Sequence, residues 1–405
     1  MHPTRIALAS LSVKLPGEDR GYSRYRSLAE ILTAVGFEVT LITSTFQHWY
    51  KAQRIQTSFT GLPYRIAEVF EPGYKRNIDL RRLRSHHIAA VNICTYFRKH
   101  QFDLIVVETP PHDFALACTS AALKQGIPCI VDINDLWPEA MQARFDPPLL
   151  GRIGYAPIRR AAKRCFSQAS AIVGTSDGYA NYPERRYGIV KPHLTVYVGS
   201  EPPGPIGPSP LPKPPGELWI SYAGTLGTSY DLETLIKAVC QLHCEPQSPQ
   251  PQLQILGDGP DREKLQALTE ELGAKAYVHF RGYMEYEQMM AVLRSSDILV
   301  NSLVKDAPQA LVNKLSDYLF AGRALVNTGS DGELRSLISD YQVGLNVPAA
   351  DVSALAEVLR TLCQDAALRK RFADNSRALA EARFDRQVEY PKIISLIEEL
   401  LPTKG

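Results

Sequence analysis

Short apolar runs alternate with helical patterns along this chain, and this alternation constrains its fold more than any other feature. In the first half, strands are predicted over residues 5–11, 38–44, 102–109, 128–135 and 170–176, with helices over residues 27–37 and 115–126. Strands that alternate with helices form parallel sheets. Gly36 stands where a left-handed residue would end the first helix, which completes a β-α-β unit.

The alternation restarts in the second half of the chain. Strands are predicted over residues 218–224, 251–259, 276–282, 298–304 and 323–329, with helices over residues 231–242, 262–273, 287–297, 313–322 and 333–341. A helical tail follows from Val352. In open parallel sheets, ligands bind beyond the carboxyl ends of the strands, so the turns after these strands are where chemistry is expected.

Residues 200–217, SEPPGPIGPSPLPKPPGE, interrupt both patterns with proline and glycine. Because 405 residues exceed the size of one hydrophobic core, we interpret this segment as a linker between domains at residues 1–199 and 218–385. Residues 386–405 are predicted to form a C-terminal helix that returns to the first domain. The alternative is a long surface loop within a single domain. The predicted fold is α/β, with two Rossmann-like domains whose parallel sheets face each other across a cleft.

Composition and charge narrow the class of protein. Apolar residues make up 45% and charged residues 22%, as in ordinary globular proteins. No run approaches the roughly 20 apolar residues of a membrane-spanning helix, and the N-terminus reads as a buried strand and not as a signal peptide. Seven cysteines without histidine partners at metal-site spacing predict a reducing cytosol and no structural zinc.

The charge is distributed unevenly over the two halves. Residues 1–200 carry 25 Lys and Arg against 16 Asp and Glu, a net +9, whereas the remainder carries −7. A basic half indicates an anionic partner, which leaves nucleic acid or an anionic lipid surface. No nucleic-acid-binding motif accompanies the basic half, so a nucleic-acid partner is not expected.

Glycine-rich turns follow successive strands of the second half. Gly224, Thr225 and Gly227 precede a helix, a context that turns backbone N–H groups toward a phosphate. Three further candidates, Gly257, Gly259 and Tyr283, follow the next two strands. The structural alternative is that these glycines serve only tight turns. Neither half contains the full dinucleotide fingerprint G-x-G-x-x-G with a later acidic residue.

The segment QALVNKLSDYLFAG, residues 309–322, precedes an apolar helix. Lys314 and Asp317 are three residues apart and share one helix face, lysine for a phosphate and carboxylate for ribose hydroxyls. The alternative is that both are solvated surface charges. Their place beside the glycine turns favours the binding interpretation.

Five segments of the chain carry a family resemblance: DINDLWPEA, YAGTLGTSYDLETLI, LGDGPDREKL, VHFRGY and NKLSDYLFAG. With them the chain resembles glycosyltransferase family 4, the retaining GT-B enzymes, over essentially its whole length. The RYR and EPGYKRN segments are similar to those of bacterial surface-polysaccharide enzymes, including transferases of N-acetylated amino sugars. The resemblance implies hexosyl or N-acetylhexosaminyl transfer from a UDP or GDP sugar to a glycan or lipid-linked acceptor. It places the acceptor on the first domain and the nucleotide sugar on the second.

The resemblance also assigns donor contacts. Gln309 and Asp317 stand where the common pattern has two glutamates, so donor contact is retained while a catalytic carboxylate at Gln309 is lost. A phosphate cradle is implied at Leu311 and Val312, with Lys314 as its cation. Relatives carry an arginine and a lysine after the glycine turn of the second domain, which GTLGTSYDLE lacks. Lys314 is therefore expected to hold more of the diphosphate charge and to assist leaving-group departure.

In the first domain, the resemblance assigns Gly21 to a loop that approaches donor and acceptor. Asn134 occupies the position of a histidine in another branch of the family. His112 is the candidate catalytic replacement, with a satisfied structural histidine as the alternative. Asp135 is the preferred catalytic group, expected at the cleft on the acceptor side, and Trp137 is interpreted as packing.

No Asp-x-Asp motif is present, so we expect no metal or other cofactor, with Lys314 and backbone N–H groups stabilising the leaving diphosphate. Two alternatives stay open: a nucleotide-sugar 2-epimerase, and a non-catalytic partner subunit, which the amide at Gln309 favours.

The basic half predicts a cytoplasmic protein that docks peripherally on anionic membrane. The alternative is a solvated helix face. The residues expected at the lipid are Lys75, Arg76, Arg81, Arg82 and Arg84, joined by Arg159, Arg160, Lys163 and Arg164.

Overall fold

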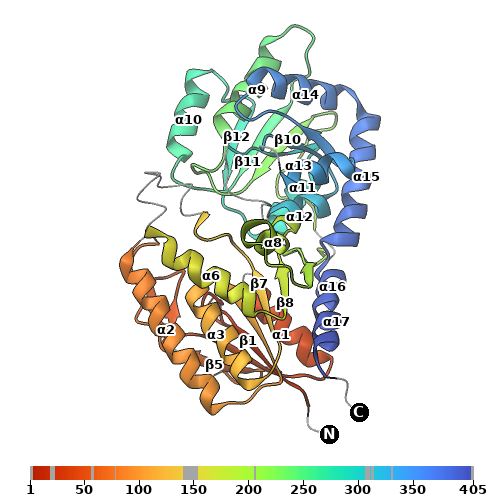
Figure 1. The fold of residues 1–405 in the computed structure, drawn as a ribbon. Coiled ribbons are helices and arrows are strands. Elements are labelled where there is room, and N and C mark those ends of the chain that lie inside the picture. Colours follow the sequence, from red (N-terminus) through yellow and green to blue (C-terminus); the bar gives the residue numbers. More distant parts are fainter. Residues whose placement is uncertain are drawn as a thin grey trace. The chain divides into compact units, whose positions relative to one another are not determined.

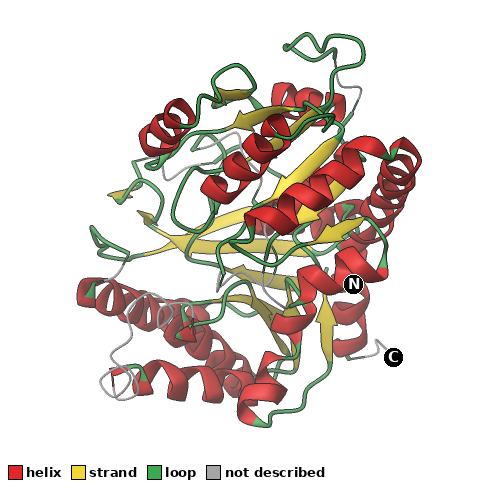
Figure 2. Cartoon of the chain, turned by 90° about the horizontal axis from the view of Figure 1, so that it is seen from above, coloured by secondary structure: helices red, strands yellow, loops and turns green. Residues whose placement is uncertain are grey.

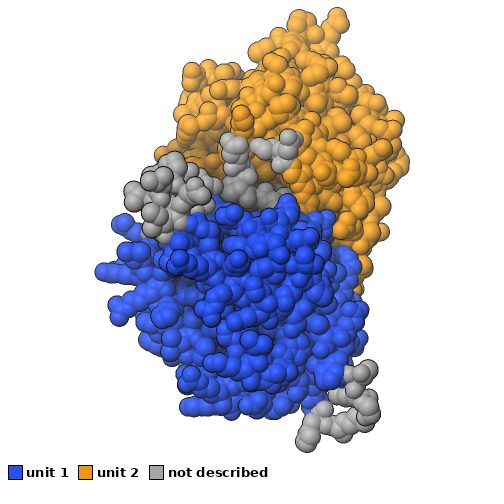
Figure 3. Space-filling view, in the orientation of Figure 1, with its two compact units in different colours: residues 1–198, 389–405 blue, residues 199–388 orange. Residues whose placement is uncertain are grey.

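The computed structural model describes residues 3–18, 23–55, 59–77, 79–139, 154–204, 207–305, 311, 314–329 and 332–402. The chain divides into two compact units, coloured separately in Figure 3. Unit 1 comprises residues 1–198 and 389–405, and unit 2 comprises residues 199–388. The proline-rich segment at 200–217 belongs to unit 2, because its two ends are held there. Ser200 pairs with Asp385, and Lys213 forms an ion pair of 2.5 Å with Asp297.

Unit 1 is built on a seven-stranded parallel sheet in the order β5-β2-β1-β6-β7-β8-β9 (Figure 1). The strands are β1 (Arg5–Ala9), β2 (Glu38–Ser44), β5 (Arg65–Val69), β6 (Leu104–Thr109), β7 (Cys129–Ile133), β8 (Ala171–Gly174) and β9 (His193–Thr195). A small antiparallel hairpin, β3 (Phe46–Gln47) and β4 (Ala52–Gln53), follows β2. The strand order reverses between β1 and β6, which is the kind of position where open α/β sheets bind ligands.

Helices cover both faces of this sheet, and Figure 2 shows strands flanked by helices. Their bounds are α1 (Arg24–Ala34), α2 (Leu80–Lys99), α3 (His112–Gln125), α6 (Ala156–Gln168), α7 (Asp177–Ala180), α8 (Tyr182–Tyr187), α16 (Arg386–Glu389) and α17 (Pro391–Leu400). Ala7 and Ala9 face a core formed with α2, α3 and α6, while Ile6 and Leu8 face a core formed with α1 and α17. The C-terminal helix α17 thus groups with unit 1 because it completes that second core.

Unit 2 repeats the arrangement with a six-stranded parallel sheet in the order β12-β11-β10-β13-β14-β15. Its strands are β10 (Trp219–Ala223), β11 (Gln252–Leu256), β12 (Val278–Gly282), β13 (Ile298–Asn301), β14 (Ala324–Asn327) and β15 (Gly344–Asn346). Its helices are α9 (Leu232–Cys244), α10 (Arg262–Glu271), α11 (Tyr286–Ser295), α12 (Lys314–Ala321), α13 (Glu333–Asp340), α14 (Val352–Gln364) and α15 (Ala366–Arg383). The order reverses between β10 and β13.

The predicted fold class is confirmed, since both units are α/β with parallel, Rossmann-type sheets. Gly36 has a φ of +99° directly after α1, as its predicted role as a left-handed C-cap requires. The sequence pattern missed the edge strand β5, because only Val69 of its five residues is buried and no apolar run marks it. Within the described residues, no helix is long and apolar enough to cross a membrane.

Candidate functional site

The candidate site of unit 2 lies where β10 and β13 end and the strand order reverses. Lys314, the first residue of α12, extends its side chain toward this edge. Its Nζ lies 3.9 Å from the ring centroids of Tyr222 and Tyr230, and 5.9 Å from that of Tyr318. A Cβ at Gly224 would lie 3.0 Å from the same Nζ. Glycine therefore leaves room for the lysine at the end of β10.

The Lys314 ammonium is buried, and it has no hydrogen-bond partner among the described residues. Burial lowers the pKa of Lys314 well below its usual range. The tyrosine rings offer the cation their negative faces. They do not accept its three N–H donors, so a ligand with anionic oxygens would satisfy groups that the described part of the chain leaves unmet.

Asp317 lies one turn further along α12 and has hydroxyl partners. Its Oδ1 accepts hydrogen bonds from Ser200 Oγ at 2.8 Å and from Tyr286 Oη at 3.0 Å. Burial raises the pKa of Asp317, and the two hydroxyl hydrogen bonds and the charge of Arg386 oppose that shift. Lys314 and Asp317 are thus brought to one end of α12 and contact different neighbours.

The glycine turns of unit 2 pack against one another. A Cβ at Gly257 would lie 2.0 Å from the carbonyl oxygen of Gly224, and one at Gly259 would lie 2.2 Å from that of Leu226. Close approach of backbone to backbone therefore explains glycine at both positions. Their predicted contact with a ligand stays a prediction, and Gly227 has no atom closer than 3.7 Å to its Cβ position.

The other predicted donor residues are less constrained by the structure. Thr225 is exposed, Tyr283 is 75% exposed, and Leu311 is half-buried. Gln309 and Val312, and Gly21 of the first domain, lie outside the described residues. The phosphate cradle assigned to the Leu311 and Val312 amides stays a prediction.

In unit 1, Asp135 organises the turn that follows β7. Its Oδ1 accepts from the Leu136 amide at 2.9 Å, and its Oδ2 accepts from Trp137 Nε1 at 3.1 Å. Burial raises the pKa of Asp135. Each oxygen retains a lone pair for a further donor, so an acceptor role is compatible with this geometry. Trp137 is buried, in keeping with its interpretation as packing.

His112 is better explained as a structural residue than as a catalytic one. It is buried at the start of α3, with Nδ1 at 2.6 Å from Thr109 Oγ1 and Nε2 at 2.8 Å from the Trp137 carbonyl. Burial lowers the pKa of His112 to about 4. A neutral ring that donates from Nε2 and accepts at Nδ1 has no nitrogen left for a substrate. These contacts favour the structural alternative for His112, and its catalytic role stays a prediction.

Sequence reasoning missed a charged group at the switch point of unit 1. Arg24 donates two hydrogen bonds to the buried carboxylate of Asp132, at 2.9 and 3.2 Å. Glu108, its neighbour on β6, accepts from Ser10 and Ser12, and burial raises the pKa of Glu108 to about 7. The available signal was a carboxylate inside each of two apolar strands, LIVVET and CIVDI.

The basic residues expected at a membrane are mostly exposed. Lys75, Arg76, Arg81, Arg84, Arg160, Lys163 and Arg164 are exposed, while Arg82 and Arg159 are half-buried. Leu80 and Leu83, interspersed with the arginines of α2, are 81% and 37% exposed. Apolar and basic side chains therefore stand together on the first turns of α2.

Comparison with known proteins assigns both halves of the chain. Residues 20–199 match the glycosyl transferase 4-like domain, and residues 208–379 match glycosyl transferases group 1. The lipopolysaccharide core biosynthesis glycosyltransferase LpsE of Rhizobium meliloti is 29% identical over 154 residues, which are 38% of this chain and 42% of that protein. The alpha-D-kanosaminyltransferase of Streptomyces kanamyceticus is 24% identical, over 45% of each chain. The matched parts thus span less than half the length of these curated relatives.

Solved structures share the fold over the whole chain. Sucrose-phosphate synthase from Thermosynechococcus elongatus aligns with a TM-score of 0.74 at 19% identity, over 98% of this chain and 99% of that one. Anabaena Alr3699/HepE in complex with UDP aligns with a TM-score of 0.69 at 16% identity, over 98% and 100% of the chains. With both halves matched and the two-sheet fold shared, the chain belongs to the GT-B glycosyltransferases, with a glycosyl transferase 4-like domain followed by a group 1 domain.

Proposed function

We propose that this protein is a retaining glycosyltransferase that moves a sugar from a nucleoside-diphosphate sugar to a glycan or lipid-linked acceptor in bacterial polysaccharide or glycoconjugate synthesis. The names of the curated relatives, a lipopolysaccharide core transferase and an amino-sugar transferase, support this class of reaction. The UDP complex of HepE supports a uridine nucleotide as the leaving group. Unit 2 would bind the donor, and unit 1 the acceptor.

The observation that carries the proposal is the buried Lys314 ammonium at the switch point of unit 2. Its Nζ faces Gly224 and two tyrosine rings and lacks a hydrogen-bond acceptor among the described residues. A diphosphate beside Gly224 would accept its N–H donors and stabilise its charge. The same contact would strengthen as the bond to the sugar breaks and charge collects on the leaving group. Lys314 would then carry out the task that other transferases give to a metal ion.

Asp317 would hold the ribose of the donor. Its carboxylate accepts from two hydroxyls, those of Ser200 and Tyr286. A ribose diol offers the same pair of donors, so binding would exchange one set of hydroxyl hydrogen bonds for another. In unit 1, Asp135 would hydrogen-bond the acceptor, since it follows β7 at the carboxyl edge of the sheet.

The test compares Lys314→Ala with Lys305→Ala, an exposed lysine that follows β13. UDP affinity is measured by calorimetry, release of UDP from UDP sugars by steady-state kinetics, and folding by circular dichroism. Loss of a charge-assisted hydrogen bond of about 1.5–3 kcal/mol should weaken UDP binding tenfold or more in Lys314→Ala. Lys305→Ala should match the parent. If folded Lys314→Ala binds and releases UDP like the parent, the donor site does not include Lys314.

The non-catalytic partner subunit is the second candidate, because an amide stands at Gln309 where a carboxylate is usual. The same kinetics separate the two candidates. A partner subunit would bind UDP sugar through Lys314 and release no UDP with any acceptor, whereas the enzyme turns the donor over.

A further inference from the structure

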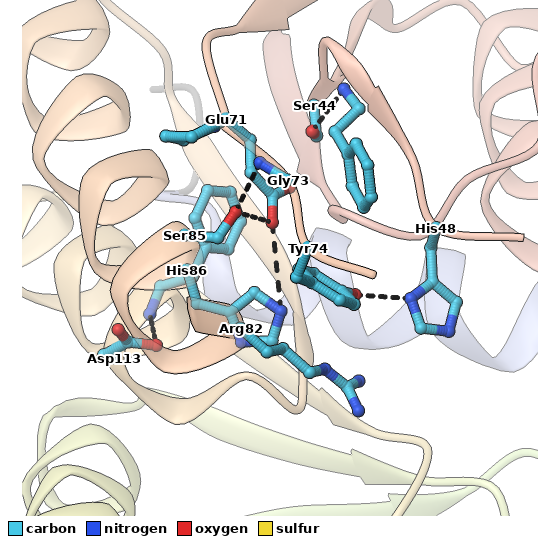
Figure 4. Close-up of polar contacts among 12 residues, drawn as sticks. Ser44, His48, Glu71, Gly73, Tyr74, Arg82, Ser85, His86 and Asp113 are labelled. Atoms are coloured by element: carbon cyan, nitrogen blue, oxygen red, sulfur yellow. Dashed lines mark hydrogen bonds and ion pairs between the residues drawn. The ribbon is translucent and has the colours of Figure 1, made fainter. Parts of the chain in front are cut away.

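A cluster of cationic and aromatic side chains at the carboxyl edge of the unit 1 sheet has no role in the function proposed above (Figure 4). Its members come from three connections after strands, those that follow β2, β5 and β7. His48 and Lys51 lie in the hairpin after β2, Tyr74 follows β5, and Arg82 lies in the first turn of α2. Trp137, in the turn after β7, packs beside them. In an open α/β sheet this is the edge at which ligands bind.

The two cations of the cluster, Lys51 and Arg82, both lie against the Tyr74 ring and both donate to Asn77. Lys51 Nζ lies 4.8 Å from the Tyr74 ring centroid, and the Arg82 guanidinium carbon lies 5.3 Å from it. Arg82 also stacks on Trp137, with the guanidinium carbon 4.4 Å from the ring centroid. Asn77 joins them, because its side-chain oxygen accepts from Lys51 at 2.6 Å and its backbone carbonyl accepts from Arg82 at 2.8 Å. We call Lys51 and Arg82 the cation pair.

The cation pair is ordered by neutral acceptors. Within the described ranges, no carboxylate lies within ion-pair distance of either residue, and Arg82 Nε is buried without a hydrogen-bond partner. The nearby Glu71 is buried and accepts from Ser85 Oγ at 2.9 Å, and burial raises its pKa. Burial and, after it, the charge of Arg82 lower the pKa of Lys51, so the two cations disfavour each other and an anion bound between them would relieve that cost.

The hairpin itself has no structural need for a lysine. Lys51 has a φ of +54°, in the left-handed region that glycine or asparagine adopts at lower cost. A lysine there brings a cation to the cluster and raises the cost of the turn. His48 adds a hydrogen-bonding group without charge. Its Nδ1 lies 2.5 Å from Tyr74 Oη, and burial lowers the pKa of His48 to about 4.

We propose that the cation pair binds a phosphate group of the acceptor. The inference rests on the proposed function, which assigns the donor diphosphate to Lys314 in unit 2 and leaves unit 1 to the other substrate. A phosphate ester presents several anionic oxygens, which suits an ammonium, a guanidinium and an unpartnered Nε within one cluster. The acceptor class is therefore a glycan or lipid carrier joined through a phosphate or diphosphate.

The test uses full-length Lys314→Ala protein, so that pyrophosphate added as the probe is not bound by Lys314, the donor anchor proposed above. In this background, Lys51→Gln with Arg82→Gln is compared with Arg98→Gln and Lys99→Gln. The second pair removes two positive charges from exposed positions in the last turn of α2, the helix that carries Arg82. Calorimetry should show pyrophosphate binding weakened tenfold or more by the first pair, and changed less than twofold by the second. Equal weakening by both pairs, or by neither, would overturn the proposal.

Two further arms keep the result interpretable. If the first pair fails to fold by circular dichroism, the half-exposed Lys51→Gln alone should still weaken pyrophosphate binding several-fold. Vesicles of phosphatidylcholine with phosphatidylglycerol test a lipid headgroup as the source of the phosphate. Lost vesicle binding with unchanged pyrophosphate binding would assign the pair to the membrane surface and overturn the acceptor site.

The outcome is independent of the donor site. UDP binding to the parent and to Lys314→Ala tests the donor anchor, and pyrophosphate binding in the Lys314→Ala background tests the cation pair. If Lys314→Ala binds UDP like the parent while pyrophosphate binding requires Lys51 and Arg82, the donor site proposed at Lys314 is wrong and the phosphate site at the cation pair is supported. If UDP binding requires Lys314 and pyrophosphate binding does not require Lys51 and Arg82, only the phosphate site at the cation pair is wrong.

Discussion

Units 1 and 2 share a sheet order and differ sharply at the edge where that order reverses. In unit 1, β6 and β7 bring the carboxylates of Glu108 and Asp132 together, with Arg24 donating to Asp132. In unit 2, β10 and β13 end in a cluster of glycine turns, and the cation there, Lys314, faces tyrosine rings. One edge is therefore built from charged side chains and the other from backbone and aromatic faces.

The difference supports the division of substrates proposed above, with the donor in unit 2 and the acceptor in unit 1. Backbone turns and a single cation suit a diphosphate, which every nucleoside-diphosphate sugar carries in the same form. Side chains that vary in charge and shape suit a partner that differs from one transferase to another. The same fold can thus hold a constant donor on one sheet and a particular acceptor on the other.

The largest expected effect tests whether the unit 2 edge depends on backbone packing. Gly257→Ala places a Cβ 2.0 Å from the Gly224 carbonyl oxygen, at a φ of +122°. Clash and strain together should lower the free energy of unfolding by about 3 kcal/mol or more. Gly227→Ala is the control, since its Cβ meets nothing closer than 3.7 Å. Urea denaturation compares them, and equal stability of the two variants would show that the turns are not mutually packed.

The next effect concerns the buried histidines of unit 1. Burial lowers the pKa of His112 to about 4, from an ordinary value of 6.5. The unfolded chain takes up a proton on this ring below pH 6.5 and the folded chain does not, so stability is lost as the pH falls from 6.5 toward 4. Between pH 7 and pH 5, His112 alone should cost about 2 kcal/mol of unfolding free energy.

His112→Gln should lose less stability than the parent over that interval, measured by urea denaturation at pH 7 and pH 5. In the same unit, burial lowers the pKa of His86 to about 3. In unit 2, burial lowers the pKa of His279 as well. Limited proteolysis at pH 5 should therefore cleave unit 1 before unit 2. An identical pH dependence in His112→Gln would contradict the structural role given to this ring.

A smaller effect is expected at Asp317, because the ribose contact proposed for it would lie away from the bond being broken. Asp317→Ala should raise the KM for UDP sugar about tenfold, equivalent to about 1.4 kcal/mol, and change kcat less than threefold. Ser200 and Tyr286 would lose the carboxylate to which they donate, so circular dichroism must accompany the kinetics. A fall in kcat with unchanged KM would indicate that Asp317 acts in the chemical step and not in donor binding.

Sequence periodicity was sufficient to predict the fold because buried strands and amphipathic helices leave a local pattern. The alternation does not by itself fix the order of the strands, although the single hand of crossover connections in parallel sheets reduces the number of possible orders. The edge strand β5 was not predicted because its residues are only partly buried, and partial burial leaves no apolar run in the sequence.

The sites were predictable only in part. Lys314 and Asp317 could be located because they lie next to each other in one helical segment. The tyrosine faces around Lys314 come from β10 and the loop after it, and the cluster of Lys51, Tyr74 and Arg82 comes from two connections, after β2 and after β5. No spacing in the sequence encodes such meetings, because the tertiary fold creates them. Burial likewise explains why His112, a candidate from its position, has both nitrogens occupied.

The smallest effect per residue concerns membrane docking, which we propose for the first turns of α2. Leu80 is 81% exposed, and Arg81 and Arg84 are exposed beside it. Each basic residue near an anionic surface contributes about 1 kcal/mol, and an inserted leucine adds apolar burial that salt does not screen. Arg81→Gln with Arg84→Gln should therefore reduce co-sedimentation with phosphatidylglycerol vesicles mainly at low salt. Leu80→Ser should reduce it at low and high salt alike.

Lys370→Gln with Lys264→Gln removes two exposed charges from unit 2 and should leave vesicle binding unchanged. Membrane docking through α2 would be wrong if binding is equally strong to neutral phosphatidylcholine vesicles, or if it survives all the α2 substitutions. The basic residues of unit 1 would then act only at the carboxyl edge of its sheet, where the acceptor is proposed to bind.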